Sequence, residues 1–350
     1  MIKCMGFLLI LSQINGKISY ICTLQPLFGY WRCFMLKPKL LQKGDTIGVI
    51  SPASPSFKRS DVRRGMDTLK QWGYKVVLSK NLNKRKGFVA GTDEERAEDF
   101  NEMFSRIDID AVFVTQGGYG SARMLRYIDF NIIQKNPKIF LGFSDITSLH
   151  LAILKKTGLI TFHGPGMSRY NPEELTDYTK NHLFKAIAST EPIGEIPLAD
   201  EKKWINTINP GVAEGIITGG NLTLICSTLG TPYEIETDGK ILFIEELETE
   251  PWIIDHMLTH LLNAGKLDKV AGIIVGECVN CTPRQHNPGY YVDMSLEDIL
   301  FEFIKPLKVP SIHGLPIGHT KDMATIPLGV RAKLDAAKKK LTIIEASVKE

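Results

Sequence analysis

The sequence predicts an α/β protein of two domains, in which an N-terminal parallel, Rossmann-like sheet precedes a second, smaller domain of mixed α/β structure. Three observations support this fold class. Short apolar runs alternate with stretches of helical periodicity between residues 46 and 156, and strands joined by single helices form parallel sheets. A polar, charged stretch over residues 171–210 ends in Asn-Pro-Gly, as interdomain linkers often do. A second group of apolar runs follows it.

Each element of the first half is predicted from its own pattern. The strands are short and almost entirely apolar, as strands buried on both faces are. The helices carry apolar residues three and four positions apart, and Thr92 and Glu95 form a capping box at the start of one of them. The expected strands are 46–50, 74–78, 110–115 and 139–141, and the expected helices are 61–72, 92–105, 117–127 (after a glycine turn) and 145–156.

The second half is predicted to hold four strands and one helix. The strands are expected at 240–245, 270–276, 330–334 and 340–344, and the helix at 252–263. Together these patterns predict an N-terminal extension (1–34), a first domain (35–170), a linker that includes a helix (171–210) and a C-terminal domain (211–350). Ligands of parallel sheets bind at the carboxyl ends of the strands, so functional residues are expected there.

The first 34 residues differ from the rest in composition. They contain Lys3, Lys17 and Arg32 but no acidic residue. Removing these three from the chain's 42 basic residues leaves the remainder balanced against its 39 acidic residues. A balanced charge argues against nucleic acid or an anionic membrane as a partner, because both need a basic surface. We expect residues 1–34 to be a mis-assigned or disordered extension and the functional chain to begin near Met35.

Cysteine usage and hydropathy favour a cytoplasmic protein. After residue 34 the chain keeps only Cys226, Cys278 and Cys281, a sparse and odd set that is not typical of a disulfide framework. No later stretch approaches the roughly 18 uninterrupted apolar residues of a transmembrane helix. A cytoplasmic location without a membrane span is therefore expected.

A serine follows an apolar run at the point where a helix is expected to begin. In the sequence Gly-Phe-Ser-Asp at 142–145, Ser144 fits a nucleophile on a strand-to-helix turn, with the N–H of Asp145 beside it to stabilise an oxyanion. The alternative is an ordinary helix N-cap, for which Ser is a preferred residue. The second glycine of the G-x-S-x-G motif is missing, since Ile146 stands there. This stretch alone leaves both interpretations open.

A glycine turn, Gly-Gly-Tyr-Gly at 117–120, also lies between an expected strand and an expected helix. Its backbone N–H groups, that of Gly118 among them, are placed to face an anion or an oxyanion. A dinucleotide fingerprint is the rival interpretation, but Arg123 stands where its third glycine is needed; the fingerprint's acidic residue is missing as well. A purely structural tight turn is the third possibility.

Acids and histidines with catalytic chemistry occur at the ends of predicted strands. Glu245 and Glu246 end an apolar strand, where a carboxylate is either a solvated loop residue or the group that orients a histidine. His319 follows a glycine at a strand-to-loop junction, where an imidazole is either solvated or reachable as a general base. His163 and His313, each followed by glycine, are its competitors.

No metal site or cofactor is predicted. His256 and His260 lie four residues apart on one expected helix, but the pattern offers no third ligand and no adjacent glutamate. Cys278 and Cys281 form a lone C-x-x-C without a second pair, which is a weak indication of zinc.

Seven of these segments, in this order, resemble the LD-carboxypeptidase family of serine peptidases, which includes muramoyltetrapeptide carboxypeptidase and the microcin C self-immunity proteins. The similarity extends from about residue 40 to about residue 337 and leaves residues 1–34 outside. The matching segments are Gly-Asp-x-Ile-Gly-Val-Ile-Ser-Pro-Ala at 44–53, Gly-Gly-Tyr-Gly at 117–120, Gly-Phe-Ser-Asp at 142–145, His-Gly-Pro at 163–165, Gly-Gly-Asn-Leu at 219–222, Glu-Glu at 245–246 and Gly-His at 318–319.

The resemblance implies a serine carboxypeptidase with a Ser-Glu-His triad. Ser144 is then the nucleophile, His319 the general base and Glu245 the acid that orients it, while the N–H groups of Gly118 and Asp145 form the oxyanion hole. The implied reaction releases the terminal D-alanine of a murein tetrapeptide by cutting an L,D bond in the cytoplasm during cell-wall recycling. The substrate is the implied partner, and homodimer formation is left open.

Recognition of the substrate's terminal carboxylate needs a cation or convergent N–H donors. Arg123 is the basic residue nearest in sequence to the glycine turn, so we assign it this role, against the alternative of a solvated helical arginine.

Two positions depart from the family pattern, and two other functions stay open. Many relatives carry arginine where Gln116 stands and where His256 stands, and the first of these departures affects expectations about substrate binding. An immunity-type hydrolase of aminoacyl-nucleotide antibiotics is the alternative within the same fold. A non-enzymatic dinucleotide or small-molecule binding module is the alternative from another class.

Overall fold

The computed structural model describes residues 11–14, 17–20, 35–56, 58–171, 173–200, 203–283 and 294–350. The chain divides into two compact units, residues 1–34 and residues 35–350. In the first unit, β1 (Leu11–Ile14) and β2 (Lys17–Tyr20) pair antiparallel, a pairing that the sequence pattern did not predict. The remainder of the expected extension lies outside the described residues. All further elements belong to the second unit.

The first sheet of the second unit has the parallel core that the sequence predicts. Its six strands lie in the order β14-β7-β6-β5-β3-β4. The five strands from β7 to β4 are parallel, while β14 pairs antiparallel with β7 at the edge. The strands are β3 (Thr46–Ile50), β4 (Lys75–Leu78), β5 (Ala111–Val114), β6 (Ile139–Gly142), β7 (Thr161–His163) and β14 (Ile326–Leu328).

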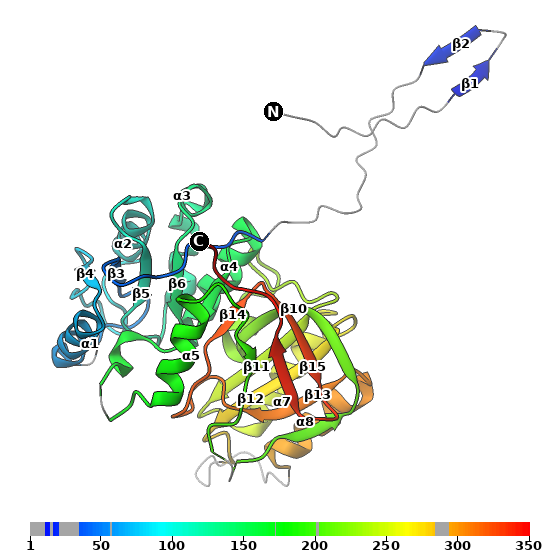
Figure 1. Cartoon of the computed structure of the whole chain (residues 1–350). Helices are drawn as coiled ribbons and strands as arrows, with labels where there is room; N and C mark the ends of the chain where they lie inside the picture. Colours follow the sequence, from blue (N-terminus) through cyan, green and yellow to red (C-terminus); the bar gives the residue numbers. More distant parts are fainter. Residues whose placement is uncertain are drawn as a thin grey trace. The chain divides into compact units, whose positions relative to one another are not determined.

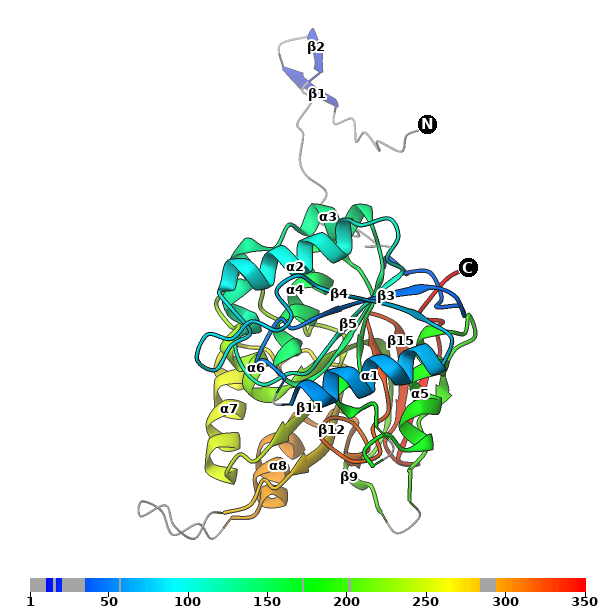
Figure 2. The same cartoon turned by 90° about the vertical axis from the view of Figure 1, so that its left-hand side faces the viewer.

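Helices cover both faces of this sheet, as the alternating pattern requires. Figures 1 and 2 show α1 (Arg59–Gln71) and α5 (Asp177–Ile187) on one face. The other face carries α2 (Asp93–Ser105), α3 (Phe130–Lys135) and α4 (Thr147–Thr157). The capping box is confirmed, because the Thr92 side chain accepts from the Glu95 N–H and Glu95 accepts from the Thr92 N–H.

The predicted helix at 117–127 is instead a 3₁₀ helix, η1 (Ser121–Tyr127). The N–H groups of Gly120 and Ser121 donate to the carboxylate of Asp145 in the short 3₁₀ segment after β6, which fixes the start of η1. The prediction of an α-helix was wrong here because this tertiary contact, together with the left-handed Gly120 (φ 106°), sets the local geometry. Short 3₁₀ segments of this kind are common as connectors.

The second sheet is mixed, with eight strands in the order β8-β16-β15-β10-β11-β12-β13-β9. Its central strands β10 to β13 are parallel, and the outer strands are antiparallel. The strands are β8 (Gly194–Glu195), β9 (Asn206–Asn209), β10 (Val212–Asn221), β11 (Ile241–Leu247), β12 (Gly272–Val279), β13 (Ser311–Leu315), β15 (Arg331–Asp335) and β16 (Lys340–Ile343).

Three helices accompany the second sheet: α6 (Leu222–Ser227), α7 (Pro251–Asn263) and α8 (Leu296–Ile304). Their apolar side chains form one buried cluster with those of β11 and β12. Helix α7 matches the prediction, and β13 is the strand implied by the strand-to-loop junction before His319, whereas β10 and α8 were not predicted. The stretch expected to be a linker contains α5, which packs on the first sheet, and β8 and β9, which are the two edge strands of the second sheet.

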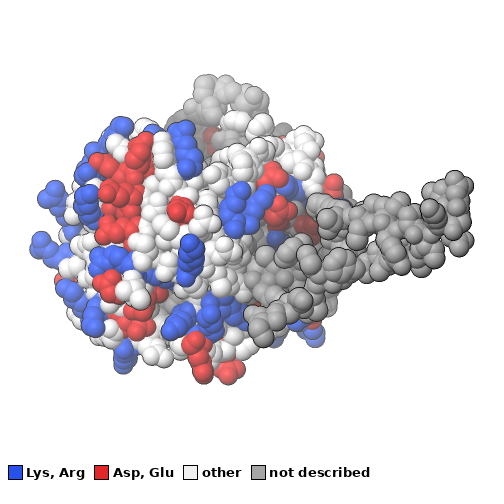
Figure 3. Space-filling view, turned by 90° about the horizontal axis from the view of Figure 1, so that it is seen from above, with Lys and Arg blue, Asp and Glu red and all other residues white. Residues whose placement is uncertain are grey.

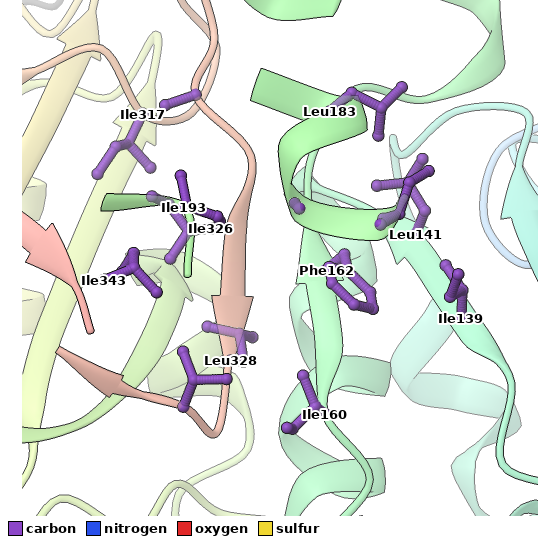
Figure 4. Close-up of a cluster of buried hydrophobic side chains, with 14 of the residues drawn as sticks. Ile139, Leu141, Ile160, Phe162, Leu183, Ile193, Ile317, Ile326, Leu328 and Ile343 are labelled. Atoms are coloured by element: carbon purple, nitrogen blue, oxygen red, sulfur yellow. The ribbon is translucent and has the colours of Figure 1, made fainter. Parts of the chain in front are cut away.

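One hydrophobic core joins the two sheets. It includes Phe162 of the first sheet and Phe243 of the second, both buried. Figure 4 shows Ile326 and Leu328 of β14 between Phe162 on one side and Ile343 on the other. Because the two sheets share this core, residues placed at their strand ends keep fixed relative positions.

The charged surface mixes both signs. In the view of Figure 3, Lys and Arg side chains lie interspersed with Asp and Glu on the described part of that face. This agrees with the balanced composition beyond residue 34. None of the described helices has the length and apolar character needed to cross a bilayer.

Buried histidines make the stability of this fold pH-dependent. Burial lowers the pKa of His150 and of His182 to about 4, from the ordinary value of 6.5. Both are therefore neutral in the folded protein at pH 5, whereas the unfolded chain takes up the protons. The contribution of these two histidines to the free energy of unfolding is present above about pH 6.5 and is lost as the pH falls from about 6.5 to about 4.

For one such histidine the loss at pH 5 is about 2 kcal/mol of unfolding free energy. We therefore expect His182→Phe to reduce the stability difference between pH 7.5 and pH 5, measured by denaturant unfolding. His260→Phe, at an exposed position of α7, is the control and should keep the wild-type difference. An unchanged pH difference in His182→Phe would contradict the assignment.

Candidate active site

Ser144 stands on a strained turn between β6 and α4. Its φ is 64°, in the left-handed region that non-glycine residues seldom occupy, and it begins the short 3₁₀ segment η2 (Ser144–Ile146). The N-cap positions of η2 and α4 are Phe143 and Ile146, and neither makes a side-chain cap hydrogen bond. The Ser144 hydroxyl is thus free of the capping role and directed elsewhere. Strain of this kind typically costs about 1–3 kcal/mol and clusters at functional sites.

The turn is possible because glycine stands opposite it. A Cβ on Gly117 would lie 2.8 Å from the Cβ of Ser144. The glycine turn after β5 therefore approaches the serine more closely than a side chain would allow.

Ser144, His319 and Glu245 form a hydrogen-bonded chain. The Oγ of Ser144 lies 2.9 Å from Nε2 of His319, and Nδ1 of His319 lies 2.7 Å from Oε2 of Glu245. Glu245 is fully buried on β11, and the His319 side chain is 12% exposed. With Glu245 ionised, Nδ1 donates to it and Nε2 is left to accept the Ser144 proton. This is the arrangement of a nucleophile, a base and an orienting acid.

Gly318 allows the acid and the base to meet. Its φ is 99°, and a Cβ at this position would lie 2.4 Å from Oε2 of Glu245. Only glycine fits before His319, because the backbone there passes directly over the carboxylate of Glu245 and a side chain would clash with it.

Glu246, the second acid of the pair, has different partners. Its carboxylate accepts from the side-chain amide of Asn221 (3.0 Å) and from the N–H and hydroxyl of Thr223 (2.9 and 2.7 Å). These bonds fix the start of α6 against the end of β11. Glu246 is placed as a structural carboxylate, whereas Glu245 faces the histidine.

The two groups predicted to form an oxyanion hole flank the serine. Asp145 follows it directly, and Gly118 belongs to the turn that Gly117 brings against Ser144. Gly118 has a φ of 108°, and a Cβ there would lie 2.4 Å from the Ser54 hydroxyl. Burial raises the pKa of Asp145, while hydrogen bonds from Ser121 and Gly120 oppose this shift. The role of the two N–H groups stays a prediction.

Arg123 lies away from these contacts. Its Nε is 3.1 Å from the Asp93 carboxylate, and its side chain is 41% exposed. Asp93 also pairs with Arg96, a buried arginine that donates to the carbonyls of Pro52 and Gly120. The carboxylate-binding role assigned to Arg123 is untested by these contacts and stays a prediction.

Comparison with known proteins identifies the family. The model of the LD-carboxypeptidase N-terminal domain matches residues 47–164, and that of the LD-carboxypeptidase C-terminal domain matches residues 214–334. The chain belongs to the LD-carboxypeptidase family. The first match contains Ser144, and the second contains Glu245 and His319.

Several relatives of this LD-carboxypeptidase family member are similar over nearly their whole length. A probable murein peptide carboxypeptidase of Bacillus subtilis is 42% identical over 319 residues, which cover 90% of this chain and 96% of that protein. The microcin C7 self-immunity protein MccF of Escherichia coli is 32% identical over 87% of this chain and 94% of that protein. These relationships confirm the expected class of enzyme, a serine-type carboxypeptidase.

Solved structures of the LD-carboxypeptidase family support the same assignment. MccF without ligand superposes with a TM-score of 0.81 at 29% identity, covering 90% of this chain and all of that one. The muramoyltetrapeptide carboxypeptidase of Oxalobacter formigenes superposes with a TM-score of 0.74 at 30% identity, covering 87% of this chain and all of that one. The predicted α/β architecture with two sheets is thereby confirmed.

The remaining sequence candidates lie outside the hydrogen-bonded chain. His256 and His260 are exposed on α7, and Cys281 donates to the carbonyl of Val279. Within the described ranges no group of three or more His, Cys, Asp or Glu side chains has the arrangement of a metal site. His163 is fully buried beside Phe243, and burial holds its pKa well below the ordinary value.

Two contacts of this LD-carboxypeptidase site were not predicted from the sequence. The Thr147 hydroxyl accepts from the Asn221 N–H at 3.0 Å, which joins the start of α4 to the end of β10. Arg169 donates to the carbonyl of Thr320, directly after His319. No local motif around Ser144 could reveal these two contacts, because each joins segments that are far apart in the sequence.

Proposed function

We propose that this protein is a serine LD-carboxypeptidase that releases the terminal D-alanine of murein tetrapeptides in the cytoplasm, with Ser144, His319 and Glu245 as its catalytic residues. The observation that carries the proposal is the continuous hydrogen-bonded chain from the Ser144 hydroxyl through His319 to Glu245. The choice of substrate is supported by the relative named as a probable murein peptide carboxypeptidase, at 42% identity.

In the first half of the reaction, His319 takes the proton of Ser144 as the serine oxygen attacks the scissile carbonyl. Glu245 holds the imidazole through Nδ1 and stabilises the positive charge that the ring gains. The N–H groups of Gly118 and Asp145 are proposed to donate to the developing oxyanion. His319 then gives its proton to the nitrogen of the leaving D-alanine, and the tripeptide stays on Ser144 as an ester.

In the second half, water replaces the leaving amine. His319 removes a proton from the water, and the resulting hydroxide attacks the ester. The collapse of this second intermediate returns the proton to Ser144 and releases the tripeptide. One water is consumed for each D-alanine released, and the enzyme is regenerated without a cofactor.

The experiment compares two peptides that differ at one stereocentre. A murein tetrapeptide ending in D-alanine is incubated with the enzyme, alongside the same peptide ending in L-alanine, and the released alanine is quantified by chiral chromatography. We expect release from the first peptide alone. An aminoacyl sulfamoyl adenosine forms a third arm. Cleavage of that compound with both peptides intact would replace the proposal by the immunity-type function.

A further inference from the structure

Arg169 contacts the residue before the proposed nucleophile and the residue after the proposed base. It ends the short segment η3 (Met167–Arg169), which follows β7. Its Nη2 donates to the carbonyls of Thr320 (2.9 Å) and Lys321 (3.1 Å), directly after His319. Its guanidinium carbon lies 6.0 Å from the ring centroid of Phe143, the residue before Ser144. That ring is in turn 5.0 Å from the ring of His319.

The acceptors of Arg169 are neutral, in contrast to those of the other cations around the site. Arg123 pairs with Asp93, and both carboxylate oxygens of Glu277 accept from Lys203, at 2.8 and 2.9 Å. Within the described ranges, the hydrogen bonds of Arg169 go to two carbonyls and to the sulfur of Met323. Carbonyl groups solvate a guanidinium but form no ion pair with it.

A partly buried cation without a direct ion pair is a candidate site for an anion. Arg169 is half-buried, and burial lowers its pKa while Glu174 and Asp322 raise it from a longer range. A guanidinium nevertheless stays charged at neutral pH. Taking such a charge out of water is costly unless an opposite charge compensates it. A bound anion provides that compensation.

The geometry of the reaction limits where the anion can be. In a carboxypeptidase substrate the free carboxylate belongs to the residue that is released, so it lies at most about 4 Å from the scissile carbonyl carbon. The cation that binds it must therefore stand beside the nucleophile and the base. Arg169 contacts Phe143, which precedes the nucleophile, and Thr320, which follows the base, whereas Arg123 is bound to Asp93 on helix α2.

We propose that Arg169 binds the free C-terminal carboxylate of the substrate and so restricts cleavage to the last peptide bond. A guanidinium has five N–H donors, and three are used by the contacts above. The Nε–H and one Nη1–H remain, and either can donate to an oxygen of a carboxylate in a charge-assisted hydrogen bond. The inference rests on the proposed carboxypeptidase function and names the residue that makes it an exopeptidase.

A purely positioning role makes a different prediction. If Arg169 only holds the loop that carries His319, its loss lowers the turnover of every substrate by the same factor. If it binds the carboxylate, its loss affects only substrates that have one. A double-mutant cycle between the side chain and the substrate's carboxylate separates the two cases.

The experiment measures kcat/KM for wild type, Arg169→Gln and Arg123→Gln with the tetrapeptide acid and with its C-terminal amide. We expect Arg169→Gln to lower kcat/KM for the acid about tenfold to a hundredfold, mainly through KM, as expected for loss of hydrogen bonds to a charged group. Amidation should cause a similar loss in wild type and little further loss in Arg169→Gln. Arg123→Gln is the matched control and should show the full effect of amidation.

Binding to the Ser144→Ala variant, followed by calorimetry, gives a second measurement that needs no turnover. There the acid peptide should bind more tightly than the amide, and Arg169→Gln should remove the difference. Equal losses on acid and amide after Arg169→Gln, or a cycle that couples to Arg123 instead, would overturn the proposal. If wild type leaves the tetrapeptide intact, the proposed function fails, and the binding cycle still decides the role of Arg169.

Discussion

Replacing Ser144 with alanine is expected to lower kcat for D-alanine release by about 10⁴- to 10⁶-fold, as for other serine nucleophiles. The covalent route is lost with the hydroxyl, and only binding and oxyanion stabilisation remain. Folding should suffer little, because the Ser144 hydroxyl makes its hydrogen bond to His319 and caps no helix. Removal of the side chain leaves the backbone strain at φ 64° in place.

The test combines kinetics with thermal unfolding. Ser144→Ala, His319→Ala and the double variant are compared for D-alanine release, and each melting temperature is recorded. Members of a triad act as a unit, so the double variant should be barely worse than either single one. Losses that multiply in the double variant would show that the two side chains act independently, and the proposed mechanism would then be wrong.

Glu245→Gln is expected to lower kcat by about 10³- to 10⁴-fold with the fold intact. The amide keeps the size of the carboxylate but cannot stabilise the imidazolium that forms during attack, and it favours the wrong tautomer of His319. Oε2 of Glu245 lies 2.7 Å from Nδ1 of His319, so the substitution acts directly on the imidazole.

Glu246→Gln is the matched control, one residue along the same strand. Its carboxylate holds Asn221 and Thr223 at the start of α6, so the amide should lower the melting temperature more than Glu245→Gln does and leave kcat within a few-fold of wild type. The reverse pattern, with activity lost in Glu246→Gln and kept in Glu245→Gln, would reverse the choice of acid.

The sequence predicted the central part of the site because local signals coincide with strand ends. Ser144, Glu245 and His319 each follow an apolar run or a glycine. Ser144 follows β6 of the first sheet, whereas Glu245 and His319 belong to the second sheet, where the carboxyl ends of the parallel strands β11 and β13 gather at one edge. The structure brings these three side chains together over separations of up to 175 residues. Their order along the chain and the family resemblance pointed to the same set, although neither gives a distance.

Other features depend on tertiary contacts that no local pattern encodes. The segment after Gly120 is 3₁₀ rather than α-helical because Asp145 binds its first N–H groups. Arg123 is close to the glycine turn in sequence, yet its side chain is bound to Asp93. Arg169 lies in a stretch without periodicity and reaches the loop after His319 across 151 residues. Proximity in sequence therefore did not indicate the contacts that Arg169 makes with the segment after His319.

The edge strand β14 has a consequence for how the protein can be divided. The chain leaves the second sheet at β13, carries His319 across, and enters the first sheet as β14, which pairs with β7. A fragment that stops before residue 326 would leave β7 as an open edge, which invites pairing with other chains. The loop that carries His319 is thus fixed at both ends by strands of different sheets. Any single cut between β7 and β14 places these two paired strands on different fragments, so neither fragment is expected to fold alone. Fusion or split-protein designs should keep the segment between β13 and β14 intact and place insertions or cuts in other exposed loops.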